Sequence, residues 1–275
     1  MQFTRYDCAP AFCEDVLDIL LEKEAENNLP ISVLTENRAQ HASGWFMGTI
    51  ADNEGIILVA LCAKPFDLFL HEAQADKPDA VDLLAQELHN LGFDPPGVCA
   101  ESGLTQRFAQ AYNGGEARTR TPMVVMRLDR LNAHDKAPGR CRTLDERDLA
   151  FVPHWELAFS EERSVQAFSI AENEERIRTR LGKDTHFIWE DGEPVSQAVH
   201  GRNTPNGAVI TWVYTPPCYR GRGYATSIVA ELSRAMLESG KLFCCLFADA
   251  DNPLSRKIYR NLGYYDVCDF EDIRF

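Results

Sequence analysis

The sequence predicts an α+β fold, a mixed and mostly antiparallel twisted sheet flanked by helices, in two consecutive domains. Three observations support this prediction. A chain of 275 residues suits two domains of ordinary size. Strand and helix patterns alternate along its second half, as they do when helices cover the faces of one sheet. A polar segment also interrupts the chain near its middle.

This polar segment gives the expected domain boundary. It follows the strand-like run at residues 124–128, and it ends in Pro138-Gly139, a pair typical of turns. We therefore expect one domain over residues 1–137 and a second over residues 138–275.

The second domain has readable local signals. Asp191-Gly192 is typical of a hairpin turn. The apolar residues of 224–238 recur at helical spacing, and Asn252 followed by Pro253 is typical of the start of a helix. In chain order we predict helices at 146–159 and 171–181, strands at 185–190, 193–199 and 208–215, a helix at 224–238, a strand at 242–248, a helix at 253–262 and a strand at 264–275.

A weak internal repeat indicates that the first domain has a related architecture. Residues 97–108 resemble residues 247–258, so that Leu104-Thr105 falls on Leu254-Ser255. The helix predicted at 81–91 precedes the first copy much as the helix ending at Glu238 precedes the second. A duplicated architecture accounts for this order.

The composition excludes several classes of partner. The formal net charge of −14 repels phosphate backbones, which argues against a nucleic-acid partner, and it weakly attracts cationic amines. No stretch approaches the roughly 20 apolar residues of a membrane span, and residues 1–7 lack the basic region and apolar core typical of a signal peptide. We expect a cytoplasmic protein without a membrane partner. Its nine cysteines form no Cys-x-x-Cys pair, which favours free thiols over a metal site.

The sharpest motif lies between a predicted strand and the helix that follows it. It reads Thr-Pro-Pro-Cys-Tyr-Arg-Gly-Arg-Gly-Tyr-Ala-Thr, from Thr215 to Thr226. A turn at this place points backbone N–H groups outward at the positive end of the helix dipole. Gly221 and Gly223 allow the main chain to approach a ligand closely, and Arg220 and Arg222 can add charge-assisted bonds. We therefore expect a pyrophosphate to bind at this turn.

Three known anion-binding loops compete for this motif. The P-loop requires Gly-Lys-Ser/Thr, which is missing, and the dinucleotide fingerprint requires a third glycine where Thr226 stands. The remaining pattern, Arg-x-x-Gly-x-Ala from Arg220 to Ala225, resembles the coenzyme A loop of the GNAT acetyltransferase superfamily. The segment from Asn252 to Tyr264 resembles the family's Asn-x-x-(Ala/Ser)-x-x-x-Tyr-x-x-x-Gly-(Phe/Tyr) segment at every named position. Two motifs in the family's order are far more specific than one.

The resemblance covers about residues 140–275 and implies two tandem GNAT-like acyl-CoA N-acyltransferase domains. It implies direct transfer of an acetyl group from acetyl-CoA, as co-substrate and without a metal, to a primary amine. The acceptor can be a small molecule or a peptide, and the protein a monomer or a homodimer. The residues that it places at the site are Trp212, Val213 and Tyr214 beside the pantetheine arm, Arg220, Gly221, Arg222, Gly223, Tyr224, Ala225 and Thr226 at the pyrophosphate, Asn252 at the pantetheine, and Tyr259 as general acid.

The chemistry explains why a tyrosine suits the acid. A phenol with a pKa of about 10 stays protonated at neutral pH and can donate to the leaving thiolate. A backbone N–H near Val213 could stabilise the oxyanion. Alternatively, Tyr259 only packs in the core with Ile258 and Leu262. The general base is not readable; the candidates are water or one of Glu156, Glu161, Glu162, His154 and His200.

The first domain departs from the family pattern. The place of the coenzyme loop is taken by residues 71–79, which are acidic and lack glycine, and Ala109 stands where Tyr259 is expected. We predict a degenerate GNAT-like domain without a coenzyme loop, which shapes the acceptor cleft or stabilises its partner domain. An unrelated α/β module is the alternative. For the whole chain, the alternative to an enzyme is a non-catalytic regulatory or scaffold protein that binds coenzyme A.

Overall fold

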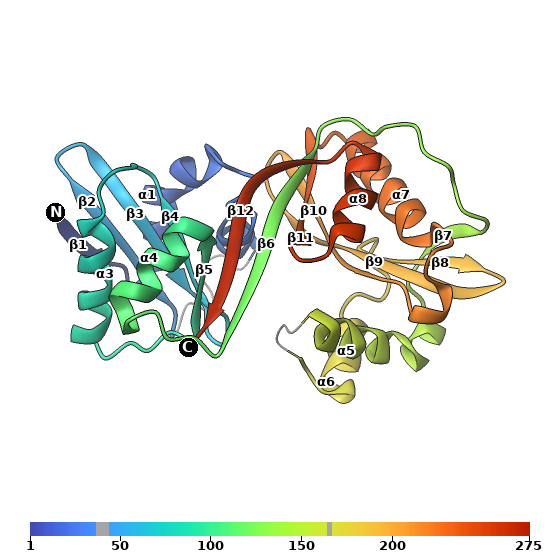
Figure 1. Cartoon of the computed structure of the whole chain (residues 1–275), viewed down its shortest axis with the longest axis horizontal. Coiled ribbons are helices and arrows are strands. Elements are labelled where there is room, and N and C mark those ends of the chain that lie inside the picture. Colours follow the sequence, from blue (N-terminus) through green and yellow to red (C-terminus); the bar gives the residue numbers. More distant parts are fainter. Residues whose placement is uncertain (37–43, 164–166) are drawn as a thin grey trace. The chain divides into compact units, whose positions relative to one another are not determined.

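The computed structural model describes residues 1–36, 44–163 and 167–275 (Figure 1). The chain forms two compact units. Unit 1 consists of Met1–Val125, Asp249–Asp251 and Val267–Phe275. Unit 2 consists of Met126–Ala248 and Asn252–Asp266.

Strands and helices follow one another in the same order twice. The first series is β1 (Gln2–Arg5), α1 (Ala9–Leu21), α2 (Asn28–Glu36), β2 (Phe46–Asp52), β3 (Gly55–Cys62), β4 (Leu68–Glu72), α3 (Asp79–Asn90), β5 (Gly97–Glu101), α4 (Ser102–Asn113) and β6 (Thr119–Leu128). The second is β7 (Arg140–Thr143), the 3-10 turn η1 (Glu146–Ala150), α5 (Val152–Arg163), α6 (Ile170–Arg178), β8 (His186–Asp191), β9 (Glu193–Asn203), β10 (Gly207–Tyr214), the short turn η2 (Pro217–Tyr219), α7 (Tyr224–Glu238), β11 (Phe243–Asp249), α8 (Pro253–Leu262) and β12 (Tyr265–Arg274). This confirms the predicted duplication and the predicted α+β class.

Strand pairing is also repeated. In unit 1, β1 to β4 form an antiparallel series, and β4 then pairs with β5 in parallel. In unit 2, β7 to β10 form the same antiparallel series, and β10 pairs with β11 in parallel. In each unit the parallel pair is joined by one helix, α3 or α7, as a parallel connection requires.

Helices cover both faces of each sheet, because side chains alternate along the strands. In unit 1, Met47 and Leu61 pack against α1 and α2, while Phe46 and Leu58 lie in the core beneath α3 and α4. In unit 2, α5 and α6 cover one face and α7 and α8 the other (Figure 1). Ile188 of β8 is part of the core under α5 and α6.

The strand β12 begins in unit 2 and ends in unit 1. It pairs antiparallel with β5, from Phe270 opposite Glu101 to Arg274 opposite Gly97, and Ile273 is fully buried in the core of unit 1. A Cβ atom at Gly97 would lie 2.3 Å from the Ile273 carbonyl oxygen, so this close approach requires glycine. The two units thus depart from the predicted division after residue 137: residues 126–137 lie in unit 2, and residues 267–275 lie in unit 1.

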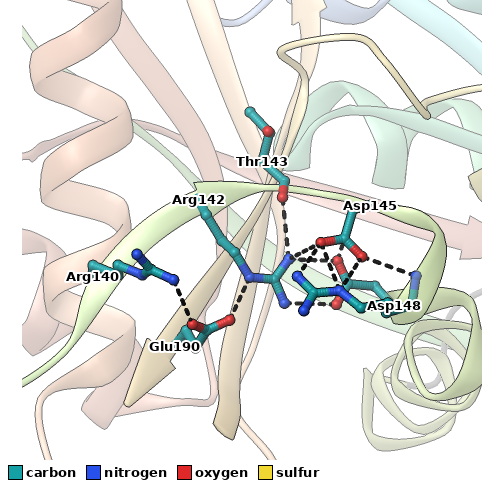
Figure 2. A network of polar contacts seen from close by, with 7 residues as sticks. Arg140, Arg142, Thr143, Asp145, Asp148 and Glu190 are labelled. Carbon is teal, nitrogen blue, oxygen red and sulfur yellow. Dashed lines mark hydrogen bonds and ion pairs between the residues drawn. The ribbon is translucent and has the colours of Figure 1, made fainter. Parts of the chain in front are cut away.

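A buried arginine network fixes the start of α5 (Figure 2). Arg142 on β7 donates through Nη1 and Nη2 to the two oxygens of Asp148, at 2.7 and 2.8 Å, and through Nε to Glu190 at 2.6 Å. Asp148 is 0% exposed and also accepts from the Asp145 N–H, while the Asp145 side chain caps η1. The network joins the turn before α5 to the β7–β8 edge of the sheet.

None of the helices in the described ranges is long and apolar enough to cross a membrane.

We predict that Ile273→Ala destabilises unit 1. Truncating a fully buried isoleucine leaves a cavity and costs about 2–4 kcal/mol of unfolding free energy. Urea denaturation measures this loss. Leu242→Ala serves as control, because Leu242 is 65% exposed and its truncation should cost less than about 0.5 kcal/mol. Equal effects of the two substitutions would contradict the role of β12 in unit 1.

We also predict that Asp148→Ala destabilises unit 2 by about 3 kcal/mol, because it leaves the Arg142 guanidinium without its bidentate partner. Glu174→Ala removes an ion pair between two exposed side chains, Glu174 and Arg178, and should cost less than about 0.5 kcal/mol. Denaturation curves of both variants test the contrast. A loss for Asp148→Ala as small as that for Glu174→Ala would rule out the anchoring role.

Candidate functional site

The sheet of unit 2 is irregular at the end of β10, which contains the residues predicted to bind the pantetheine arm. The parallel pairing of β10 with β11 covers Gly207–Val209 and ends there. The pairing with β9 shifts register between Thr211 and Tyr214, and Trp212 has a φ of +53°, which is rare for a bulky residue. Such a bulge re-aims backbone groups at the edge of a ladder. The residues Trp212, Val213 and Tyr214 therefore lie on a distorted strand beyond the point where β10 and β11 are paired.

The predicted pyrophosphate turn joins this strand to α7. Gly221 and Gly223 have φ values of +77° and +82°, and Gly223 is the N-cap of α7, which begins at Tyr224. A Cβ atom built at Gly221 would have no neighbour within 4 Å, so this part of the turn borders open space. The first N–H groups of a helix have no partner within it and attract anions. The geometry of the turn matches that chemistry.

Hydrogen bonds hold this turn in place. The Tyr224 hydroxyl donates to Asp191 at 2.6 Å and so joins the start of α7 to the β8–β9 hairpin. Arg220 donates through Nε to the Thr215 carbonyl at 2.8 Å, and through Nη2 to Glu162 at 2.7 and 2.8 Å. Its guanidinium thus joins α5 to the residue that follows β10, and the expected bond of Arg220 to phosphate stays a prediction. Arg222 is exposed and contacts the Cys218 carbonyl at 3.4 Å.

Asn252 immediately precedes α8, and Tyr259 lies within that helix. Asn252 is the N-cap, as predicted, because its side-chain oxygen accepts from the Ser255 N–H at 3.1 Å. Tyr259 is 9% exposed, and its ring packs edge-on against Tyr264 with ring centres 5.9 Å apart. Burial raises the pKa of Tyr259 to about 12, although the Arg163 guanidinium opposes this rise, so the phenol is protonated at neutral pH.

The structure separates the five candidate bases by their environments. Glu156 is fully buried beside Arg180, and burial raises its pKa while Arg180 opposes the rise. Glu162 is paired with Arg220. Burial lowers the pKa of His200 and favours its neutral form. His154 and Glu161 are exposed. The contacts single out no base.

The corresponding place in unit 1 has other chemistry. Lys77, just before α3, is bound to Asp52 and Glu54 of the β2–β3 hairpin, at 2.5 and 2.7 Å. Glu72, the last residue of β4, accepts two bonds from Arg107 of α4, at 3.0 and 2.7 Å. The first turn of α3 also carries two acidic residues, Asp79 and Asp82, whose charge would oppose a phosphate.

Across the described ranges, no group of three or more His, Cys, Asp or Glu side chains is arranged to hold a metal ion.

Comparisons with known proteins agree with this architecture. Residues 140–267 match the family model described as acetyltransferase (GNAT) domain. No curated protein sequence matches the chain significantly. Among solved structures, the GCN5-related N-acetyltransferase from Sphaerobacter thermophilus aligns with a TM-score of 0.66 at 16% identity, covering 99% of this chain and 95% of that one.

Two other solved structures also align with the whole chain. A GNAT-family acetyltransferase from Colwellia psychrerythraea aligns with a TM-score of 0.62 at 11% identity, covering 100% of both chains. A tandem GNAT protein from the clavulanic acid biosynthesis pathway aligns with a TM-score of 0.56 at 16% identity, covering 99% of this chain and 98% of that one. Residues 140–267 are thus a domain of the GNAT acetyltransferase family, and the chain as a whole has the tandem GNAT fold.

Proposed function

We propose that the protein is an N-acetyltransferase that moves an acetyl group from acetyl-CoA to a primary amine by direct transfer. The observation that carries this proposal is the turn at Gly221 and Gly223. Both glycines have a left-handed backbone conformation, and Gly221 borders open space. The turn leads into the 15-residue helix α7. A helix start of this kind offers N–H groups and a positive dipole end to a diphosphate.

The coenzyme would lie along the distorted part of β10. Beyond Val209, β10 is no longer paired with β11, so its backbone can bind the amide groups of a pantetheine arm at Trp212, Val213 and Tyr214. Arg220, Arg222, Tyr224, Ala225 and Thr226 complete the turn with Gly221 and Gly223, and the side-chain nitrogen of Asn252 would reach the pantetheine. Arg220 has a supporting part here, because its guanidinium is bound to Thr215 and Glu162.

The chemical step needs an oxyanion partner and a proton donor. The Val213 N–H would stabilise the charge that develops on the thioester oxygen as the amine attacks the carbonyl carbon. As the carbon–sulfur bond breaks, Tyr259 would donate its proton to the leaving sulfur; the proton that the amine loses would pass to water, and Tyr259 would be reprotonated from solvent. Burial holds the pKa of Tyr259 at about 12, which keeps that proton available at neutral pH.

Unit 1 would have no coenzyme of its own in this proposal. The carboxylates of Asp79 and Asp82 at the start of α3 repel a diphosphate, and Lys77 is already paired with two carboxylates. Its part would be to support or shape the reaction that unit 2 performs on a small-molecule or peptide amine.

We predict that Gly221→Ala weakens coenzyme A binding by at least ten-fold, because an alanine disfavours the left-handed backbone that aims the N–H groups. Isothermal titration calorimetry measures the affinity. Gly182→Ala is a matched control: Gly182 has a φ of +69° and no neighbour within 4 Å of a Cβ atom. Each substitution should cost about 1 kcal/mol of stability. Coenzyme affinity that falls equally in both variants would argue against the turn as the binding site.

We predict that Tyr259→Phe lowers turnover by about 10²-fold while coenzyme affinity stays within two-fold, because only the proton donor is lost. Tyr264→Phe is the control, since Tyr264 is also buried but its hydroxyl is bonded to Ser233 at 2.9 Å. It should keep turnover. Because the pKa of Tyr259 is about 12, wild-type turnover should show no loss from its ionisation between pH 7 and 10.

Release of free thiol across a panel of amines measures this turnover. Full turnover by the Tyr259→Phe variant would remove the acid assignment. Coenzyme binding by the wild type with no thiol release on any amine would favour a regulatory or scaffold protein instead.

A further inference from the structure

The bulge in β10 interrupts the regular ladder that this strand forms with β9. In a regular antiparallel pair, every second residue of β10 would exchange backbone hydrogen bonds with β9. The register shift between Thr211 and Tyr214, together with the left-handed Trp212, breaks that pattern. A buried carbonyl that loses its ladder partner needs another donor.

Two adjacent side chains of β9 donate to backbone carbonyls on either side of Val213. The Ser196 hydroxyl donates to the Tyr214 carbonyl at 3.0 Å and also lies 2.8 Å from the Thr215 hydroxyl. The Gln197 side-chain nitrogen donates to the Trp212 carbonyl at 3.5 Å. Both side chains are 0% exposed. Their bonds therefore bracket Val213, whose N–H is the proposed oxyanion donor.

An ion pair lies beside the His186 ring, which is next to the Gln197 side chain. Glu156 of α5 is ion-paired with Arg180, and an Arg180 nitrogen lies 3.5 Å from Nδ1 of His186. Burial, with the charge of Arg180, lowers the pKa of His186 to about 3, so the ring is neutral and has one N–H group. Because Nδ1 faces a donor, that N–H must be on Nε2.

The His186 ring in turn interacts with the Gln197 side chain. Nε2 of His186 and Oε1 of Gln197 are both buried, and neither has a hydrogen-bond partner among the residues in the described ranges. The ring N–H matches the amide oxygen, which leaves the amide nitrogen of Gln197 directed to the Trp212 carbonyl. The hydrogen bond that this amide makes is therefore that of its nitrogen to the Trp212 carbonyl, and the neutral His186 ring is compatible with that orientation.

We infer that Ser196 and Gln197 are positioning residues for acetyl transfer, which hold the Trp212–Tyr214 bulge in the shape that binds the pantetheine arm and aims the Val213 N–H. The inference rests on the proposed function, because it assigns the bulge a part in that reaction. It does not make either side chain a catalytic residue, since both act through the backbone of β10.

The test compares Ser196→Ala and Gln197→Met with Ser32→Ala in the full chain. Ser32 is a matched control: it is 3% exposed and donates to a backbone carbonyl, that of Leu29, at 3.0 Å. Hydrogen exchange measured by mass spectrometry reports the backbone of residues 207–215, and calorimetry with coenzyme A as the probe reports affinity. In each β9 variant we expect exchange at residues 207–215 to be at least ten-fold faster and the coenzyme Kd to rise at least five-fold. The Ser32 variant should show neither change.

Hydrogen exchange and calorimetry test different parts of the inference about Ser196 and Gln197. Unchanged exchange in both β9 variants would overturn it, whatever the wild type binds. Faster exchange with an unchanged Kd would overturn the part that concerns coenzyme binding. If the wild type itself failed to bind coenzyme A, the proposed function would be lost, while the exchange rates would still decide whether these side chains hold the bulge.

Discussion

The end of pairing between β10 and β11 is the constraint on which the geometry of the site depends. The two strands are paired from Gly207 to Val209 and then separate. The backbone N–H and C=O groups that would otherwise bond to the neighbouring strand can therefore bind a ligand. Site residues lie on both sides of the opening between β10 and β11. The bulge at Trp212 lies on one strand, and α8, with Tyr259, follows the other.

An opening of this kind costs free energy of folding, which contacts nearby must offset. A left-handed tryptophan and interrupted ladder bonds each disfavour the folded state. The surroundings offset this with buried polar contacts from β9, with ring packing of Phe159 on Trp212, and with the link from Arg220 to Glu162. Since Phe159 and Glu162 both lie on α5, the arginine network at the start of that helix also supports the site. Stability and ligand binding are thus served by the same elements.

Much of unit 2 could be predicted from the sequence, because its signals are local. The helix over Tyr224–Glu238, the hairpin at Gly192 and the cap at Asn252 depend on residues close in the chain, and the structure has each of them. The partners of Arg220 could not be predicted, because Glu162 is distant in sequence and nothing local joins the two. Ser196 and Gln197 were missed for the same reason: they read as ordinary strand residues until the register of β9 and β10 is known. The path of β12 into unit 1 was missed as well, because a strand pattern says nothing of which neighbour it will join.

That path affects the order in which the protein can be made. During synthesis the N-terminal part of a chain is usually free to fold first. Unit 1, however, takes residues 267–275 into its sheet and its core, and the ribosome adds those residues only after all of unit 2 has been translated. Until then the edge of β5 is uncovered, and an uncovered strand edge is a place where chains associate wrongly. The nascent protein therefore has a period of exposure to aggregation and chaperone capture whose length is set by the translation time of its second half.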